Sequence, residues 1–119
     1  MAIISRGLGF VVASYTGTAA NLALDLGFIP AHAFGHIGIV TASFKSWQWS
    51  NGMSQAAGGT ALVFGVVATQ NGQTAIGLGQ GGISTLTGAA GTGIGLTIGT
   101  DTTINTAGEP WIVTAFEPM

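Results

Sequence analysis

Short runs of β-branched, aromatic and aliphatic residues recur along the whole chain, and the runs are separated by glycine, proline or Asn-Gly pairs. Leu22, Leu24 and Leu26 take every second position, which is the period of a half-buried β-strand. No apolar stripe continues at helical spacing beyond a turn or two. Further strands are expected over residues 8–15, 34–44, 60–69, 73–78, 83–87, 93–98 and 111–116. The pattern predicts an all-β chain, an antiparallel β-sandwich of jelly-roll type that forms a single domain over residues 1–119.

Two short features predict local geometry. Asn71-Gly72 tolerates the positive φ angles of a type I′ turn, so the preceding strand should fold back as a hairpin onto residues 73–78. Gly35 and Gly38 interrupt the strand expected over residues 34–44. Either glycine marks a β-bulge or a place where a neighbouring group approaches the backbone closely.

Charge is scarce, because only 5% of the 119 residues are charged whereas soluble domains have about 25%. A surface with so few charges has weak electrostatic protection against association, which favours a built-in part of an assembly. The two basic residues, Arg6 and Lys45, stand far apart in the sequence, so no nucleic-acid partner is expected. The chain has no cysteine and no apolar run of about 18 residues, so neither disulfides nor a membrane segment are expected.

Patterns that carry chemistry are weak. Residues 77–82 match G-x-G-x-x-G, but the sequence after them is not helical, so we do not expect a phosphate-binding turn. His32 and His36 have the spacing of two zinc ligands on a helix, but in an extended segment they lie about 13 Å apart. A metal shared between subunits on an oligomer axis stays open, beside two hydrogen-bonded histidines at a surface or subunit contact. No catalytic residue, metal site or cofactor is predicted.

Trp47 and Trp49 alternate, so both side chains should point to one face of a strand. An exposed pair of this kind can stack on sugars or a receptor, with Tyr15 completing the platform. A buried pair belongs to the core or to a subunit interface, where tryptophan is enriched, and this is the preferred interpretation. Tyr15, His32, His36, Trp47 and Trp49 are therefore the candidate interface or ligand-platform residues.

Two groups of short motifs extend from Tyr15 to Phe116. The first comprises Tyr15-Thr16-Gly17, Asp25-Leu26-Gly27-Phe28-Ile29-Pro30, Trp49 and Gly52-Met53, and the second comprises Ile98-Gly99-Thr100-Asp101, Ile104-Asn105, Gly108 and Trp111-Ile112-Val113-Thr114-Ala115-Phe116. Together they resemble small virion proteins of bacteriophages. The resemblance implies a β-sandwich displayed on a capsid or carried on a tail or fibre, and it brings no catalytic residues. Residues 31–36 depart from that pattern, which has a Val/Ile-rich strand there.

These observations predict a non-enzymatic phage structural protein located in the virion, namely a capsid decoration subunit that stabilises the shell. It would associate with itself as a trimer and pack against the major capsid protein or other virion proteins, with moderate affinity per contact. Residues 1–8, which include Arg6, are a candidate docking arm, with a plain edge strand as the alternative. The alternative function is a receptor- or glycan-binding module of a tail or head fibre. A secreted enzyme is a third option, for which no acid–base pair stands out.

Overall fold

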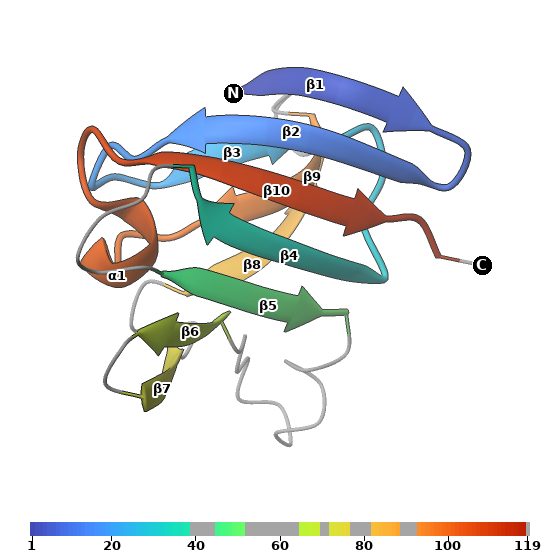
Figure 1. Ribbon diagram of the computed structural model, residues 1–119. Coiled ribbons are helices and arrows are strands. Elements are labelled where there is room, and N and C mark those ends of the chain that lie inside the picture. Colours follow the sequence, from blue (N-terminus) through green and yellow to red (C-terminus); the bar gives the residue numbers. More distant parts are fainter. Residues whose placement is uncertain (39–44, 52–64, 70–71, 77–81, 89–92, 119) are drawn as a thin grey trace.

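The computed structural model describes residues 1–38, 45–51, 65–69, 72–76, 82–88 and 93–118, which form β-strands and one helical turn (Figure 1). The strands are β1 (Ala2–Gly7), β2 (Phe10–Thr16), β3 (Leu22–Asp25), β4 (His32–Ile37), β5 (Ser46–Ser50), β6 (Gly65–Thr69), β7 (Gly72–Ile76), β8 (Ile83–Thr87), β9 (Ile94–Ile98) and β10 (Pro110–Phe116). The helical turn, α1, covers Thr102–Asn105. The predicted all-β character is confirmed.

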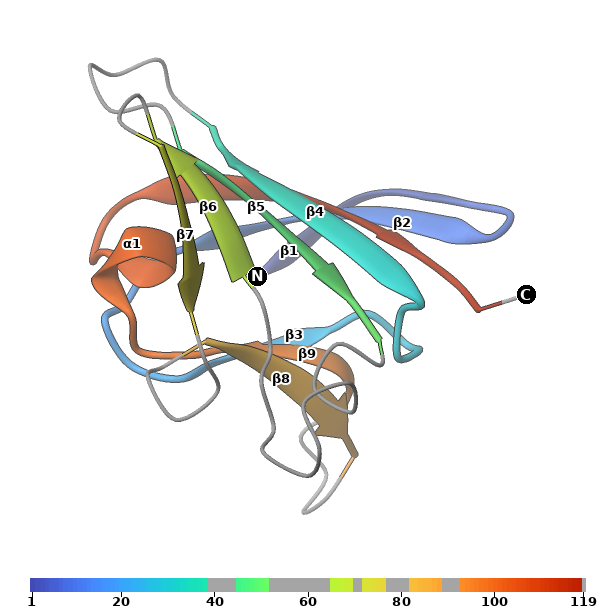
Figure 2. The ribbon, with the colours of Figure 1, turned by 90° about the horizontal axis from the view of Figure 1, so that it is seen from below.

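The strands form two antiparallel sheets. The larger sheet has seven strands in the order β1-β2-β10-β4-β5-β6-β7, and the smaller has three in the order β3-β9-β8. The chain crosses between them several times, because β3 leaves the β1–β2 hairpin for the small sheet and β4 returns to the large one. After the β8–β9 hairpin, β10 inserts between β2 and β4. Figure 2 shows the two sheets facing each other.

The hydrophobic core lies between the two sheets. Its members are Val11, Ala13, Tyr15, Ala33, Trp47, Trp49, Trp111, Val113 and Ala115 of the large sheet, Leu24, Ile83, Leu96 and Ile98 of the small sheet, Leu26 and Ile104. The predicted leucine alternation is confirmed, since Leu24 and Leu26 are buried while Ala23 and Asp25 are exposed. One face of each sheet therefore packs against the other sheet and is buried in this core.

Most strand bounds agree with the sequence, and the differences have local causes. The strand expected over residues 34–44 begins earlier, at His32, and β4 ends at Ile37, while residues 39–44 lie outside the described residues. Leu8 was expected inside a strand but lies in the turn between β1 and β2, where Gly9 adopts a φ of 85° that favours glycine.

The predicted hairpin of β6 and β7 is present, but its register differs from the prediction. Thr69 pairs with Gly72, so the two residues between the strands are 70 and 71. The predicted Asn71-Gly72 turn would lie one position later along the chain. Residues 70 and 71 themselves lie outside the described residues.

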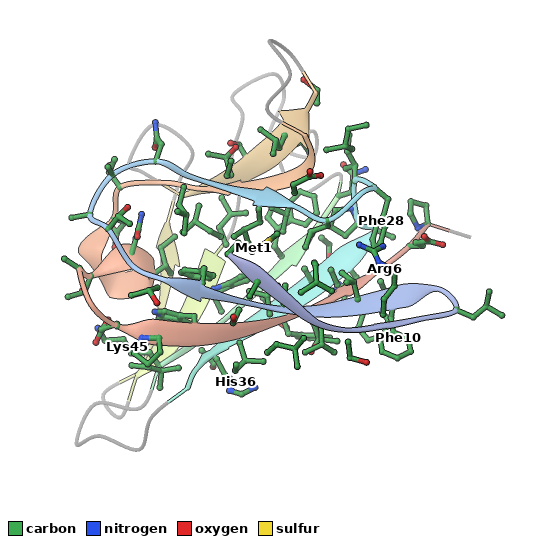
Figure 3. The ribbon with its side chains drawn as sticks, turned by 90° about the horizontal axis from the view of Figure 1, so that it is seen from above. Met1, Arg6, Phe10, Phe28, His36 and Lys45 are labelled. Atoms are coloured by element: carbon green, nitrogen blue, oxygen red, sulfur yellow. The ribbon has the colours of Figure 1, made fainter. Side chains whose placement is uncertain are left out.

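The N-terminal strand β1 lies at one edge of the large sheet and pairs with β2. Its register shifts between Ile3 and Ser5, an irregularity that makes a sheet edge less able to pair with another chain. Arg6 Nη2 donates a hydrogen bond to the Leu26 carbonyl at 3.1 Å, and its side chain points toward the small sheet near Phe28 (Figure 3). Residues 1–8 thus include the edge strand expected as the alternative to a free arm, and a docking role for them stays a prediction.

Candidate interaction surface

The three aromatic residues of the expected ligand platform are buried. Tyr15 and Trp47 are each 2% exposed and Trp49 is 1% exposed, and all three point into the core between the sheets. The preferred interpretation of Trp47 and Trp49 as core residues on one face is confirmed. An exposed platform of Tyr15, Trp47 and Trp49 is wrong for this chain, because the small sheet and its connections cover the face to which they point.

Gly35 is the reason that an indole ring fits on this face. Gly35 of β4 pairs with Trp47 of β5, and a Cβ atom at Gly35 would overlap the Trp47 ring. Only glycine leaves this space open. Of the two alternatives predicted for Gly35, the close approach is therefore the one observed.

A chain of hydrogen bonds fixes two of the buried aromatic side chains, Tyr15 and Trp47. Trp47 Nε1 donates to Tyr15 Oη at 3.2 Å, and Tyr15 Oη donates to the Ile104 carbonyl at 2.8 Å. The Tyr15 ring also stacks on Trp111, with ring centroids 6.0 Å apart and planes 3° from parallel. Burial raises the pKa of Tyr15 above its ordinary value, the Trp47 hydrogen bond opposes the rise, and the negative charge of Glu109 adds to it.

Asn105, at the end of α1, was not singled out from the sequence as a structural anchor, although it belongs to the motifs behind the family resemblance. The residue is fully buried. Its Nδ2 donates to the carbonyls of Ala20 and Gly99, both at 2.7 Å, and its Oδ1 accepts from the Thr18 N–H at 2.7 Å. One amide side chain therefore connects the end of α1 with the end of β9 and with the segment that follows β2. This role could not be predicted from the local sequence, because an Asn in a Thr-rich segment is typical of an exposed loop and two of its three partners lie far away in the chain.

The opposite side of the large sheet is the surface left open by this core. We define the outer face as the side chains of β2, β10, β4 and β5 that alternate with the buried ones. Strand pairing arranges them in three rows: Phe10, Phe116, His32 and Ser50; Val12, Thr114, Phe34 and Gln48; Ser14, Ile112, His36 and Ser46. Phe10 and His36 mark this side in Figure 3, away from the small sheet. None of these residues is buried.

Aromatic rings on the outer face meet edge to face. The ring centroids of His32 and Phe34 lie 4.4 Å apart at 83°, and those of Phe34 and Phe116 lie 6.1 Å apart at 87°. Phe34 and Phe116 are 41% and 40% exposed, a large value for phenylalanine in the middle of a sheet. The outer face therefore exposes an aromatic cluster that was not predicted from the sequence.

Both candidate histidines belong to the outer face. His32 Nδ1 hydrogen-bonds Ser50 Oγ at 2.7 Å, and His36 Nδ1 donates to the Ile37 carbonyl at 3.3 Å. They lie on one strand, so the prediction of an extended segment is confirmed and the two rings do not converge on one ion. A metal shared between subunits stays a prediction.

The outer face as defined carries no lysine, arginine, aspartate or glutamate. Lys45, just before β5, donates to both carboxylate oxygens of Glu109, at 3.0 and 3.2 Å. Glu117 follows Phe116 in the chain and is exposed. Fixed charge therefore lies beside this surface and not within it.

Within the described residues, no group of three or more histidine, aspartate or glutamate side chains is placed to hold a metal ion. The G-x-G-x-x-G tract is followed by strand β8, not by the helix that a phosphate-binding turn requires. Among the same residues, no helix is long and apolar enough to cross a membrane.

Comparison with known protein families gave no match, and neither did comparison with curated proteins or with solved structures.

Proposed function

We propose that this chain is a non-enzymatic structural protein of a bacteriophage virion, a decoration subunit that packs on the capsid shell and stabilises it. In this proposal the two packed sheets form a β-sandwich of jelly-roll type, and three copies associate around a symmetry axis. The major capsid protein or other virion proteins are the further partners.

The observation that carries the proposal is the uncharged outer face of the large sheet. Five of its twelve residues are phenylalanine, valine or isoleucine, and the others are serine, threonine, glutamine and histidine. Such a surface forms contacts through packing and neutral hydrogen bonds, as the cores of protein interfaces do, since charged residues are depleted there. The scarcity of charge in the whole chain supports a protein that lives beside copies of itself.

The copy number in purified virions tests this proposal. Quantitative mass spectrometry with isotope-labelled peptides should find many copies per particle, on the order of hundreds, because a decoration subunit repeats with the shell lattice. A handful of copies would favour a fibre or tail location. Absence from the particle would overturn the proposal.

The second candidate function is a receptor- or glycan-binding module at a fibre tip. Burial of Tyr15, Trp47 and Trp49 removes the platform considered as the alternative, but Phe34 and Phe116 on the outer face supply exposed rings in its place. Binding of a glycan array by the purified protein, lost on Phe34→Ala, would favour this function.

A further inference from the structure

We propose that the outer face of the large sheet is the surface through which copies of this chain contact one another. The inference rests on the self-association in the proposed function and assigns it a location. The aromatic cluster around Phe34 forms the centre of the contact, and the neighbouring polar side chains surround it.

Charge decides which partner fits. A nucleic acid or an anionic lipid surface requires clustered basic residues, but Arg6 points toward the small sheet and Lys45 is held by Glu109. A strongly charged protein partner would bury charges opposite a surface that offers no counter-charge, which is costly. A partner that presents an uncharged face avoids this cost. A second copy of this chain is such a partner, because it carries the same outer face.

The polar residues of the outer face are also self-complementary. Gln48 lies opposite Phe34 in the sheet and is exposed. Its side-chain amide both donates and accepts hydrogen bonds, as do serine and threonine hydroxyls. The same groups on a second copy can therefore pair with them, because each side offers both donors and acceptors.

The geometry of the rings disfavours a glycan as the occupant. Phe34 is nearly perpendicular to both His32 and Phe116, at 83° and 87°. A sugar ring stacks on an aromatic surface that lies flat beneath it, and these three rings do not share a plane. Interlocking side chains from a second protein surface fit such an edge-to-face cluster better.

The size of the face predicts the strength of the contact. Four strands about 4.8 Å apart and three rows of residues cover roughly 400 Å² of sheet. This is about half of what each partner buries in an interface of standard size. Self-association should therefore be weak and concentration-dependent in free solution, and a repeated lattice would reinforce it.

Sedimentation equilibrium of the whole chain, from low micromolar to several hundred micromolar, tests the inference with charge-insertion variants. Gln48→Glu places a carboxylate on the outer face with almost no change in shape, and Phe34→Glu places one at the centre of the aromatic cluster. Asn21→Asp is the matched control, because it makes the same change from amide to carboxylate at an exposed residue just before β3 of the small sheet, outside the outer face. Near-UV circular dichroism checks that each variant is folded, and Gln48→Glu keeps the test valid if Phe34→Glu does not fold.

The wild type and Asn21→Asp should associate with the same constant, and Gln48→Glu should weaken association at least tenfold. Added salt should restore part of the loss, since it screens the new like charges. Association of Gln48→Glu equal to that of wild type would overturn the inference, and so would a wild type that stays monomeric. A monomer present at high copy number in virions would leave the decoration of the shell standing but not the trimer. An oligomer absent from virions would overturn the function and not the interface.

Discussion

The two faces of the large sheet are built from the same strands, β2, β10, β4 and β5, yet their side chains differ in burial and in how tightly they are packed. On the inner face, Trp47 fits against Gly35 and donates to Tyr15, which in turn donates to Ile104. On the outer face, Phe34 meets the rings of His32 and Phe116 edge to face and stays 41% exposed. Aromatic residues alternate onto both sides, so residue type alone does not separate them.

The inner face is therefore fixed by contacts between the two sheets, whereas the outer face stays exposed. Inner residues meet groups that are far away in the sequence and have little freedom, so changes there should cost folding free energy. Outer residues contact side chains of neighbouring strands in the same sheet and stay partly exposed, so changes there should cost little in the single chain. Substitutions on the two faces test this contrast, and the largest effect is expected on the inner face.

Gly35→Ala should destabilise the protein by about 3 kcal/mol, because the added methyl group overlaps the rigid, buried Trp47 ring. Urea denaturation followed by tryptophan fluorescence measures the loss. The double variant Gly35→Ala/Trp47→Phe should recover part of it, since the smaller ring makes room, and this coupling identifies the cause. A loss below about 1 kcal/mol would show that the inner face adapts more easily than we argue.

Asn105→Ala should cost about 2 kcal/mol, because the Ala20 and Gly99 carbonyls and the Thr18 N–H lose their partner. Asn21→Ala is the matched control, since Asn21 is exposed, and it should change the unfolding free energy by less than about 0.5 kcal/mol. Chemical denaturation of both variants makes the comparison. Equal effects at the two positions would contradict the role assigned to the buried amide.

Stability should fall at alkaline pH through Tyr15, the only tyrosine in the chain. Burial raises its pKa in the folded protein, so the unfolded chain loses the phenolic proton first, above about pH 10. The stabilisation is complete below that value and is lost as the pH rises toward the folded pKa, by about 1.4 kcal/mol per pH unit.

Phenolate absorbance near 295 nm reports this single residue, and it should appear together with unfolding. Tyr15→Phe is the control, because it removes the titrating group, and its unfolding free energy should depend less on pH in this range. Phenolate absorbance in a protein that is still folded at pH 10 would contradict the burial argument.

Phe34→Thr should have the smallest effect on folding, at most about 1 kcal/mol, because it removes only the edge contacts with His32 and Phe116. Threonine keeps a strong preference for strands. The measurement is the unfolding free energy at a dilution where the protein is monomeric. A loss as large as that of Gly35→Ala would remove the contrast between the two faces.

Several features of the fold were accessible from the sequence because they depend on neighbours along the chain. The bounds of β8, the alternation of Leu24 and Leu26, and the shared face of Trp47 and Trp49 follow from the two-residue period of a strand. The β6–β7 hairpin followed from its turn residues, although its register differs from the predicted one. The candidate histidines were also placed correctly on an extended segment.

The strand pattern, the scarcity of charge and the residues that share a side of each strand could all be predicted from the sequence. The covered side of each sheet, the insertion of β10 between β2 and β4, and the burial of Ile104 and Asn105 depend on tertiary contacts. The physical reason is separation along the chain. The Tyr15–Ile104 hydrogen bond joins residues 89 positions apart, and whether an aromatic side chain becomes core or surface depends on such distant partners, not on its local pattern.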